Sequence, residues 1–112
     1  MPQMVVTSGM STFLVTASAN VAFLVDSTAT QVWLKVATNP TNGHIIAIKD
    51  WKGQSQNTAS RILLLGYSGG VSVEDPNNRG HYGPTALLNV QGCSPVWQYN
   101  LAQNEYICWD RL

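Results

Sequence analysis

The sequence predicts an all-β fold, either an antiparallel β-sandwich or a jelly-roll-like domain, with about eight to nine short strands and little helix. Three observations lead to this prediction. Val, Ser, Thr, Asn and Gln are abundant whereas Lys and Glu are scarce, a composition typical of strands and turns. Short apolar runs recur about every 8 to 12 residues, with turn residues between them. Windows long enough for a helix lack the apolar spacing of an amphipathic helix.

Turn signals divide the chain into strands. The clearest breaks are the loop 39–43, which ends in an Asn-Gly turn signal, the polar loop 53–60, and the stretch 75–83. The last reads DPNNRGHYG and predicts a surface excursion. Between the breaks we predict nine strands, at residues 12–16, 21–25, 31–36, 44–50, 61–65, 71–74, 86–90, 96–101 and 106–109.

Alternation within the runs assigns side chains to the two faces of each strand. In 44–50, Ile46 and Ile48 share one face and Ile45 and Ala47 share the other, so both faces are apolar. This pattern is typical of a central strand that is buried on both sides. Alternation also separates the faces of two other strands. In 31–36, Val32, Leu34 and Val36 point one way and Trp33 and Lys35 the other. In 96–101, Trp97, Tyr99 and Leu101 share one face and Gln98 and Asn100 the other.

The two cysteines are predicted to be free. A hairpin that turns about Gln103 and Asn104 would place Cys108 opposite Tyr99 and leave Cys93 beyond the end of the pairing. Bridged Cα atoms lie within about 7 Å of each other, which this register does not allow. We therefore expect two structural thiols that pack as small apolar groups.

Length and charge favour a single domain, residues 1–112, that works inside an assembly. The 112 residues are 45% hydrophobic, enough for one core. Only 11% are charged, and six Lys and Arg balance six Asp and Glu. This balance argues against nucleic acid and against an anionic membrane as partners. A net charge of zero also promotes association between proteins.

Targeting signals are not evident in the sequence. No stretch reaches the 18 or more apolar residues of a membrane span. The N-terminal residues lack the basic and apolar regions of a secretory signal. The expected location is the cytoplasm of the producing cell, or a particle assembled there.

The motifs of common enzymes are also missing. The sequence contains no GxxxxGK[ST], GxGxxG or GxSxG motif, and no His or Cys pair with metal-ligand spacing. Asp26, Asp50 and Asp75 each end a strand or begin a turn, where a carboxylate commonly accepts hydrogen bonds from nearby backbone N–H groups. We expect no enzymatic activity, no catalytic residue, no metal and no cofactor.

Four residues are candidate contacts for a partner or a glycan: Trp51, Arg79, His81 and Tyr82. Trp51 follows the strand 44–50 and precedes a Lys-Gly turn, so we expect it to be exposed. The other three belong to the excursion. Exposed aromatic rings near amide side chains suit sugar stacking or a protein interface, whereas packing within the sheet and simple solvent exposure are the competing interpretations.

Residues 16–66 contain VAFLVDSTATQVWLKV, then GHIIAIKDWKG, then a polar loop and an aliphatic strand. This order resembles a pattern in bacteriophage virion proteins, where LVD-T precedes a Thr-rich turn, a VTL strand and G-ITIKD--G. Two features depart from the pattern: Ala37 and Thr38 stand where a proline usually closes the second strand, and 75–83 is an insertion. The matching positions are Leu24, Val25, Asp26, Val32, Leu34, Gly43, Ile46, Ile48, Lys49, Asp50, Gly53, Asn57, Ile62 and Leu64.

The resemblance implies a β-structured, non-enzymatic virion protein and leaves two functions open. The first is a capsid decoration or cement protein that binds the outer shell and stabilises contacts between major capsid subunits. Such a protein would be a homo-oligomer (dimer or trimer) on the virion surface, made in the host cytoplasm. The alternative is a tail-fibre tip or tailspike-associated module for a host-surface glycan or receptor. In that case Trp51 and Tyr82 would form an exposed cluster with Asn77 and Asn78.

Overall fold

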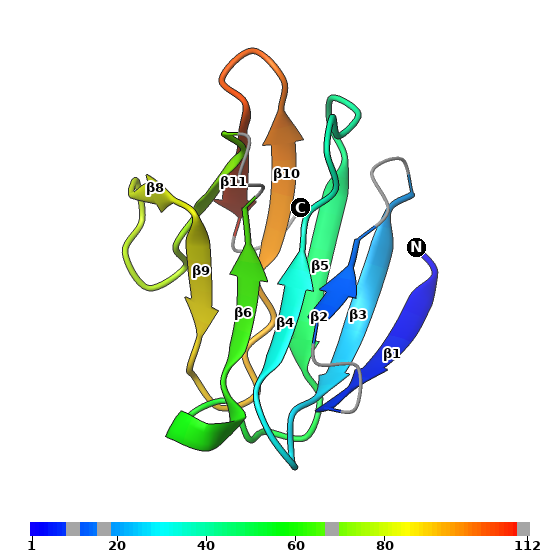
Figure 1. The fold of residues 1–112 in the computed structure, drawn as a ribbon, viewed down its shortest axis with the longest axis vertical. Coiled ribbons are helices and arrows are strands. Elements are labelled where there is room, and N and C mark those ends of the chain that lie inside the picture. The colour runs from blue at the N-terminus through cyan, green and yellow to red at the C-terminus, as the bar shows by residue number, and fades with distance from the viewer. Residues whose placement is uncertain (9–11, 16–18, 67–69, 110–112) are drawn as a thin grey trace.

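The computed structural model describes residues 1–8, 12–15, 19–66 and 70–109, and it is a sandwich of two β-sheets (Figure 1). The larger, sheet A, has seven strands, and the smaller, sheet B, has four. Among the described residues there is no α-helix, and a single 3-10 turn spans Thr58–Ser60. The predicted two-layer β architecture with little helix is therefore confirmed.

The strands occupy the sheets in an order that differs from their order in the chain. Sheet A runs in space as β1 (Gln3–Thr7), β3 (Val21–Asp26), β5 (Ile45–Asp50), β10 (Val96–Asn100), β11 (Glu105–Trp109), β7 (Ser72–Glu74) and β8 (Tyr82–Gly83). Sheet B runs as β2 (Thr12–Leu14), β4 (Val32–Lys35), β6 (Ile62–Leu65) and β9 (Thr85–Leu88).

Both sheets are mixed, so the prediction of an antiparallel sandwich is wrong. From β1 to β6 the chain alternates between the sheets, and the strands of sheet A run opposite to those of sheet B (Figure 1). Two neighbours within a sheet are therefore separated by a strand that returns through the other sheet, and they run in the same direction. This makes β1–β3–β5 and β2–β4–β6 parallel, while β5–β10, β10–β11 and β6–β9 are antiparallel.

The core lies between the sheets and is built by alternate residues of each strand. In β4 and β5 the buried and half-buried positions alternate without interruption. The separation of the two faces of β4 is therefore confirmed, whereas the predicted burial of both faces of β5 is wrong, because Ile45 and Ala47 are half-exposed. Trp97 and Tyr106 are the largest side chains that are fully buried. Aliphatic side chains at the inward positions of both sheets fill the remaining space, among them Val25, Val32, Leu34, Ile46, Ile48, Ile62, Leu64 and Leu88.

All nine predicted strands are present, with bounds that shift by one or two residues where the structure describes them; Thr16, the predicted end of the first, lies outside the described residues. Two strands were not predicted. β1 has an uninterrupted run of only Met4, Val5 and Val6, and β8 is a two-residue strand within the excursion. Both lie at an edge of sheet A.

The β10–β11 hairpin has a different register from the one predicted. Cys108 faces Trp97 and not Tyr99, because the connection is the four-residue turn 101–104. Leu101 belongs to this turn and is 58% exposed, so its predicted place on the same strand face as Trp97 and Tyr99 is also wrong. The shift is two residues, which leaves every other side chain of the hairpin on its predicted face. Both cysteines are free, as predicted.

The aspartates anchor turns as the sequence predicts. Asp26 and Asp75 accept hydrogen bonds from the N–H groups of Thr28 and Asn77, each at 3.0 Å. Asp50 is buried, and its carboxylate accepts hydrogen bonds from backbone N–H groups of three later residues, Gln54, Ser55 and Gly92.

His44 has a structural environment at the other end of β5. Its Nε2 lies 2.8 Å from the carbonyl oxygen of Ala19, and its Nδ1 lies 2.8 Å from the hydroxyl of Tyr106. A carbonyl oxygen can only accept, so Nε2 carries a proton and donates to it. In the neutral imidazole, Nδ1 then accepts from the Tyr106 hydroxyl. Burial, and to a smaller extent the nearby Tyr99, raise the pKa of Tyr106.

Candidate functional site: the outer face of sheet A

The side of sheet A that points away from the core carries apolar side chains, although a sheet with one solvated side usually carries polar ones there. We call this surface the outer face. The ladder registers place side chains of neighbouring strands next to one another across it. Its apolar members are Val5, Ala22, Leu24, Ile45, Ala47, Val96, Ile107 and Trp109.

The outer face is continuous across five strands. One row runs from Ala22 through Ala47 and Val96 to Trp109, and each residue is directly paired with the next. A second row joins Ile45, Gln98 and Ile107. Side chains that are paired in this way lie about 4.5 to 5.5 Å apart at Cβ, close enough to form one surface.

Two adjoining shallow grooves follow the outer face. The larger, of about 530 Å³, lies over β3, β5 and the start of β10, and its lining includes Leu24, Ile45, Ala47 and Val96. The smaller, of about 260 Å³, lies over β10, β11 and the loop before β5. Its lining includes Ile107 and Trp109 together with the amides of Asn42, Gln98 and Asn100.

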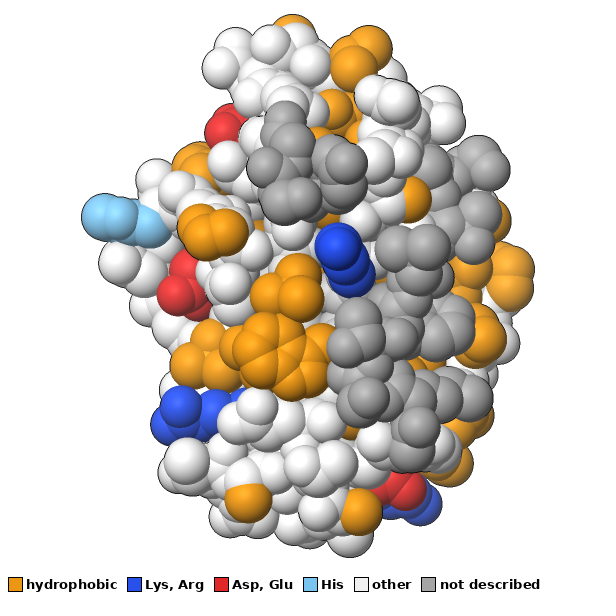
Figure 2. Space-filling model, viewed as in Figure 1, with side chains coloured by type: hydrophobic (Ala, Val, Ile, Leu, Met, Phe, Trp, Pro, Cys, Tyr) orange, Lys and Arg blue, Asp and Glu red, His pale blue; other side chains and the backbone are white. Residues whose placement is uncertain are grey.

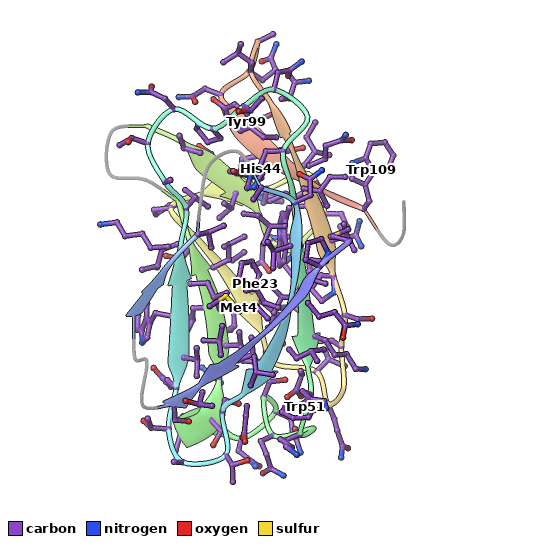
Figure 3. The ribbon with its side chains drawn as sticks, turned by 90° about the vertical axis from the view of Figure 1, so that its right-hand side faces the viewer. Met4, Phe23, His44, Trp51, Tyr99 and Trp109 are labelled. Carbon is purple, nitrogen blue, oxygen red and sulfur yellow. The ribbon has the colours of Figure 1, made fainter. Side chains whose placement is uncertain are left out.

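Trp109 is the most prominent side chain of this surface. It is 43% exposed and projects from the sheet away from the core, in contrast to Met4 and Phe23, which lie between the sheets (Figure 3). Lys49 is the only Lys or Arg on the outer face of β3, β5, β10 and β11, and its Nζ donates to the carbonyl oxygen of Gly92 at 2.5 Å. The same face carries the carboxylates of Asp26 and Glu105, so it offers apolar area and amides with one basic and two acidic side chains.

Sheet B also presents apolar side chains outward. Trp33, Leu63 and Leu87 are paired across β4, β6 and β9 and are half-buried. Figure 2 shows hydrophobic side chains gathered over these strands, with a basic side chain beside them. We base the functional argument on sheet A because its outer face holds the two grooves and the exposed Trp109.

The structure brings three of the four predicted contact residues together. Arg79, His81 and Tyr82 lie on the excursion between β7 and the end of β8, and all three are exposed. Trp51 is also exposed, at 44%, but it follows the end of β5. Four strand spacings of about 4.8 Å separate β5 from β8, so Trp51 follows a strand that lies roughly 19 Å from the strand that holds Tyr82.

The excursion is anchored to β11 by Glu74 and Arg79. β7 pairs with β11 at Ser72 and Val73, which lie opposite Glu105 and Tyr106. The Glu74 carboxylate accepts from the N–H groups of Cys108 and Gly80, at 2.7 and 2.6 Å. Arg79 donates from Nη1 to the carbonyl oxygen of Cys108 at 3.0 Å. Burial, followed by the charge of Glu74, raises the pKa of Tyr82 in the same cluster.

Sequence reasoning missed the outer face, although part of its signal was present. Ile45 and Ala47 were recognised as a second apolar face and were interpreted as buried. β5 is central, between β3 and β10, but no other layer of described residues covers this side, and both side chains are half-exposed. Residues 21–25 and 45–48 are apolar on both faces of their strands, and this pattern in two neighbouring strands is the signal that indicates the outer face.

Other kinds of site have no support within the part of the chain that the structure describes. No group of three or more His, Cys, Asp or Glu side chains there could hold a metal ion. No described helix is long and apolar enough to cross a membrane.

No protein-family model matches the chain, and no curated protein matches it.

Proposed function

We propose that this chain is a bacteriophage virion structural protein, a capsid decoration or cement protein that binds major capsid subunits on the outside of the shell. The observation that carries the proposal is the continuous apolar outer face of sheet A, from Val5 to Trp109. Exposed apolar patches of this kind mark interaction surfaces, and aromatic side chains are enriched at the centres of protein interfaces. Its location would be the virion surface, after synthesis in the host cytoplasm.

The sequence resemblance supports the type of domain and does not identify a site. Most of its apolar positions, such as Val25, Val32, Ile46 and Ile62, are core residues. Asp50, which also matches the pattern, accepts hydrogen bonds from the N–H groups of Gln54 and Ser55 in the turn after β5. Most of the matching residues therefore build the β3–β6 part of the sandwich, and of the matching positions Leu24 and Lys49 also belong to the outer face.

A matched pair of tryptophan variants tests the proposal. Trp109 and Trp51 are 43% and 44% exposed, but only Trp109 belongs to the outer face. Shells that lack the chain are mixed with purified protein, and binding is measured by co-sedimentation. Trp109→Ala should weaken binding at least about tenfold, because truncating an interface Trp commonly costs 2 kcal/mol or more. Trp51→Ala should bind like the wild type. Equal binding by wild type and both variants would contradict the assignment of the outer face.

The second candidate function is binding of a host-surface glycan or receptor as a tail-fibre tip or tailspike-associated module. The observation that favours it is the exposed excursion, which gathers His81 and Tyr82 with Asn77 and Asn78. An aromatic ring beside amides suits sugar stacking. Trp51 lies outside this group, so the four-residue cluster expected from the sequence is reduced to the excursion.

The same protein preparations separate the two functions. Under the glycan proposal, Tyr82→Ala abolishes binding to host-cell glycans on an array, while Trp109→Ala leaves it unchanged. Under the decoration proposal, the chain shows no glycan binding and Tyr82→Ala sediments with shells like the wild type.

A further inference from the structure

We infer that two copies of this chain associate through β1, which pairs antiparallel with itself and joins the two A sheets into one. This inference goes beyond shell binding and does not depend on it, because it rests on the edge of sheet A and not on the outer face. Three features of β1 support it: the outward N–H and C=O groups of its backbone, the symmetry of these groups, and the absence of charged side chains in residues 1–25.

β1 is the terminal strand of sheet A and pairs only with β3. The N–H of Ala22 donates to the carbonyl oxygen of Pro2 at 2.9 Å, which fixes the direction of the backbone groups. In a parallel pair alternate residues face the partner, so Pro2, Met4 and Val6 face β3. The N–H and C=O groups of the other residues, Gln3, Val5 and Thr7, point to the free edge.

These groups complement a second copy of themselves. If Val5 is paired with Val5 of the second copy, Gln3 is paired with Thr7 and Thr7 with Gln3. Every N–H and C=O group on the edge then has a partner, because the three residues are spaced evenly about Val5. The arrangement has a two-fold axis at Val5, perpendicular to the sheet, and is therefore a closed dimer.

The flank that contains β1 lacks the charged side chains that usually prevent edge pairing. Natural edge strands are protected by charged side chains, bulges or covering loops. Residues 1–25 contain no Asp, Glu, Lys, Arg or His. Val5 and Met4 are 43% and 39% exposed, so pairing would also bury apolar area.

The opposite edge of sheet A has the protection that β1 lacks. There the excursion places Glu74 and Arg79 against the backbone of β11, and its exposed residues include His81. Figure 1 places β1 at one flank of the sandwich and β8 at the other. Only one of the two edges of sheet A is uncharged. A closed dimer is therefore favoured over a filament that continues through both edges.

The dimer would also extend the outer face. A two-fold axis perpendicular to sheet A keeps the outer faces of both copies on the same side. Val5 of one copy would then lie beside Val5 of the other, and the apolar surface would continue from one A sheet into the next. A dimer of this kind could contact two neighbouring subunits of a shell.

Cysteine cross-linking tests the pairing and its register. Cα atoms of a hydrogen-bonded antiparallel pair lie about 5.5 Å apart, within the range for a disulfide. Val5→Cys should therefore form an intermolecular disulfide at residue 5 on mild oxidation. Thr7→Cys is the register control: its Cα would lie more than about 13 Å from that of the second copy. The wild type, with its two native cysteines, is the background control, and mass spectrometry identifies the linked residues.

Sedimentation of the purified chain measures the association itself. The wild type should have twice the monomer mass of 12.2 kDa. Val5→Lys, which places two like charges side by side at the two-fold axis, should weaken association at least about tenfold. Val90→Lys makes the same change at an exposed valine elsewhere and should stay dimeric.

Three results would overturn the inference: a monomeric or trimeric wild type at concentrations up to about 1 mM, a dimer that Val5→Lys leaves intact, or equal cross-linking of Val5→Cys and Thr7→Cys. Circular dichroism checks that the variants are folded, and if Val5→Lys is not, the two cysteine variants decide. Shells are absent from all of these experiments, so their outcome is independent of the proposed function.

Discussion

At the scale of single residues, Asp50 shows how one side chain holds distant segments together. It ends β5, and its carboxylate accepts hydrogen bonds from the N–H groups of Gln54, Ser55 and Gly92 and from the Ser55 hydroxyl. Burial alone would raise the pKa of Asp50, but the hydrogen bonds outweigh it and hold the pKa below its ordinary value of 3.8. The ionised form is therefore favoured by folding.

Asp50→Asn should lower the free energy of unfolding at pH 7 by about 2 kcal/mol or more, because an amide replaces a charged acceptor that serves several donors. A lowered pKa in the folded state contributes stability above the unfolded pKa, and this stability is lost as the pH falls through the folded pKa. The difference between wild type and variant should therefore narrow below about pH 4. Urea unfolding at several pH values measures the difference in the free energy of unfolding between the wild type and the variant. Asp75→Asn, in an exposed turn, is the control, and a pH-independent difference would contradict this account.

The sequence predicted part of this site. An Asp at a strand end indicates hydrogen bonds to the next few backbone N–H groups, and Asp26, Asp50 and Asp75 confirm that prediction. The bond from Gly92 could not be predicted, because it joins residues 42 positions apart and depends on where the loop before β10 lies. Hydrogen bonds between residues close in the chain can be predicted from the sequence. Hydrogen bonds between distant residues can be predicted only when the arrangement of the strands is known.

At the scale of elements, Glu74 attaches the excursion to the edge of β11. Its carboxylate accepts from the N–H groups of Cys108 and Gly80, and its backbone carbonyl accepts from the indole N–H of Trp97 at 2.9 Å. One buried carboxylate therefore joins two points of the excursion to β11, beside the hydrogen bond from Arg79.

Glu74→Gln should loosen the excursion without unfolding the sandwich, because the charged acceptor is lost while the Trp97 contact to the backbone is kept. Amide hydrogen exchange should become faster at Cys108, Gly80 and His81, and unchanged in β3 and β5. Glu105→Gln removes the same charge from the neighbouring strand and is the control. Exchange that is equally slow at Cys108 in both variants would show that Glu74 does not anchor the excursion.

The strands were easier to predict than their partners. Alternation in β4 and β10 correctly grouped the side chains of each face, because it depends only on the period of the strand. It contains no information on which strand lies beside which, so the parallel pairs and the outer face were missed. β1 was missed because its apolar run is too short to stand out from the residues around it.

At the scale of the whole molecule, low charge and apolar surfaces act together. Six positive and six negative side chains leave no net charge, and the outer face carries few of them. Binding through such a surface depends on apolar area and hydrogen bonds and is only weakly screened by ions.

Association of the chain with shells should therefore change little between low salt and about 1 M salt, where the Debye length falls to about 3 Å. Co-sedimentation across a salt series measures this, with the shells alone as a control for their integrity. A loss of binding as salt rises would mean that charged groups outside the outer face dominate the interface.

The copy number of this chain in purified particles tests the central claim most directly, and quantitative mass spectrometry measures it relative to the major shell subunit. A decoration protein bound to shell subunits through sheet A predicts a number comparable with that of the shell subunit. A few copies per particle would contradict the claim and would place the chain in the tail, where the excursion with Tyr82 becomes the candidate binding surface.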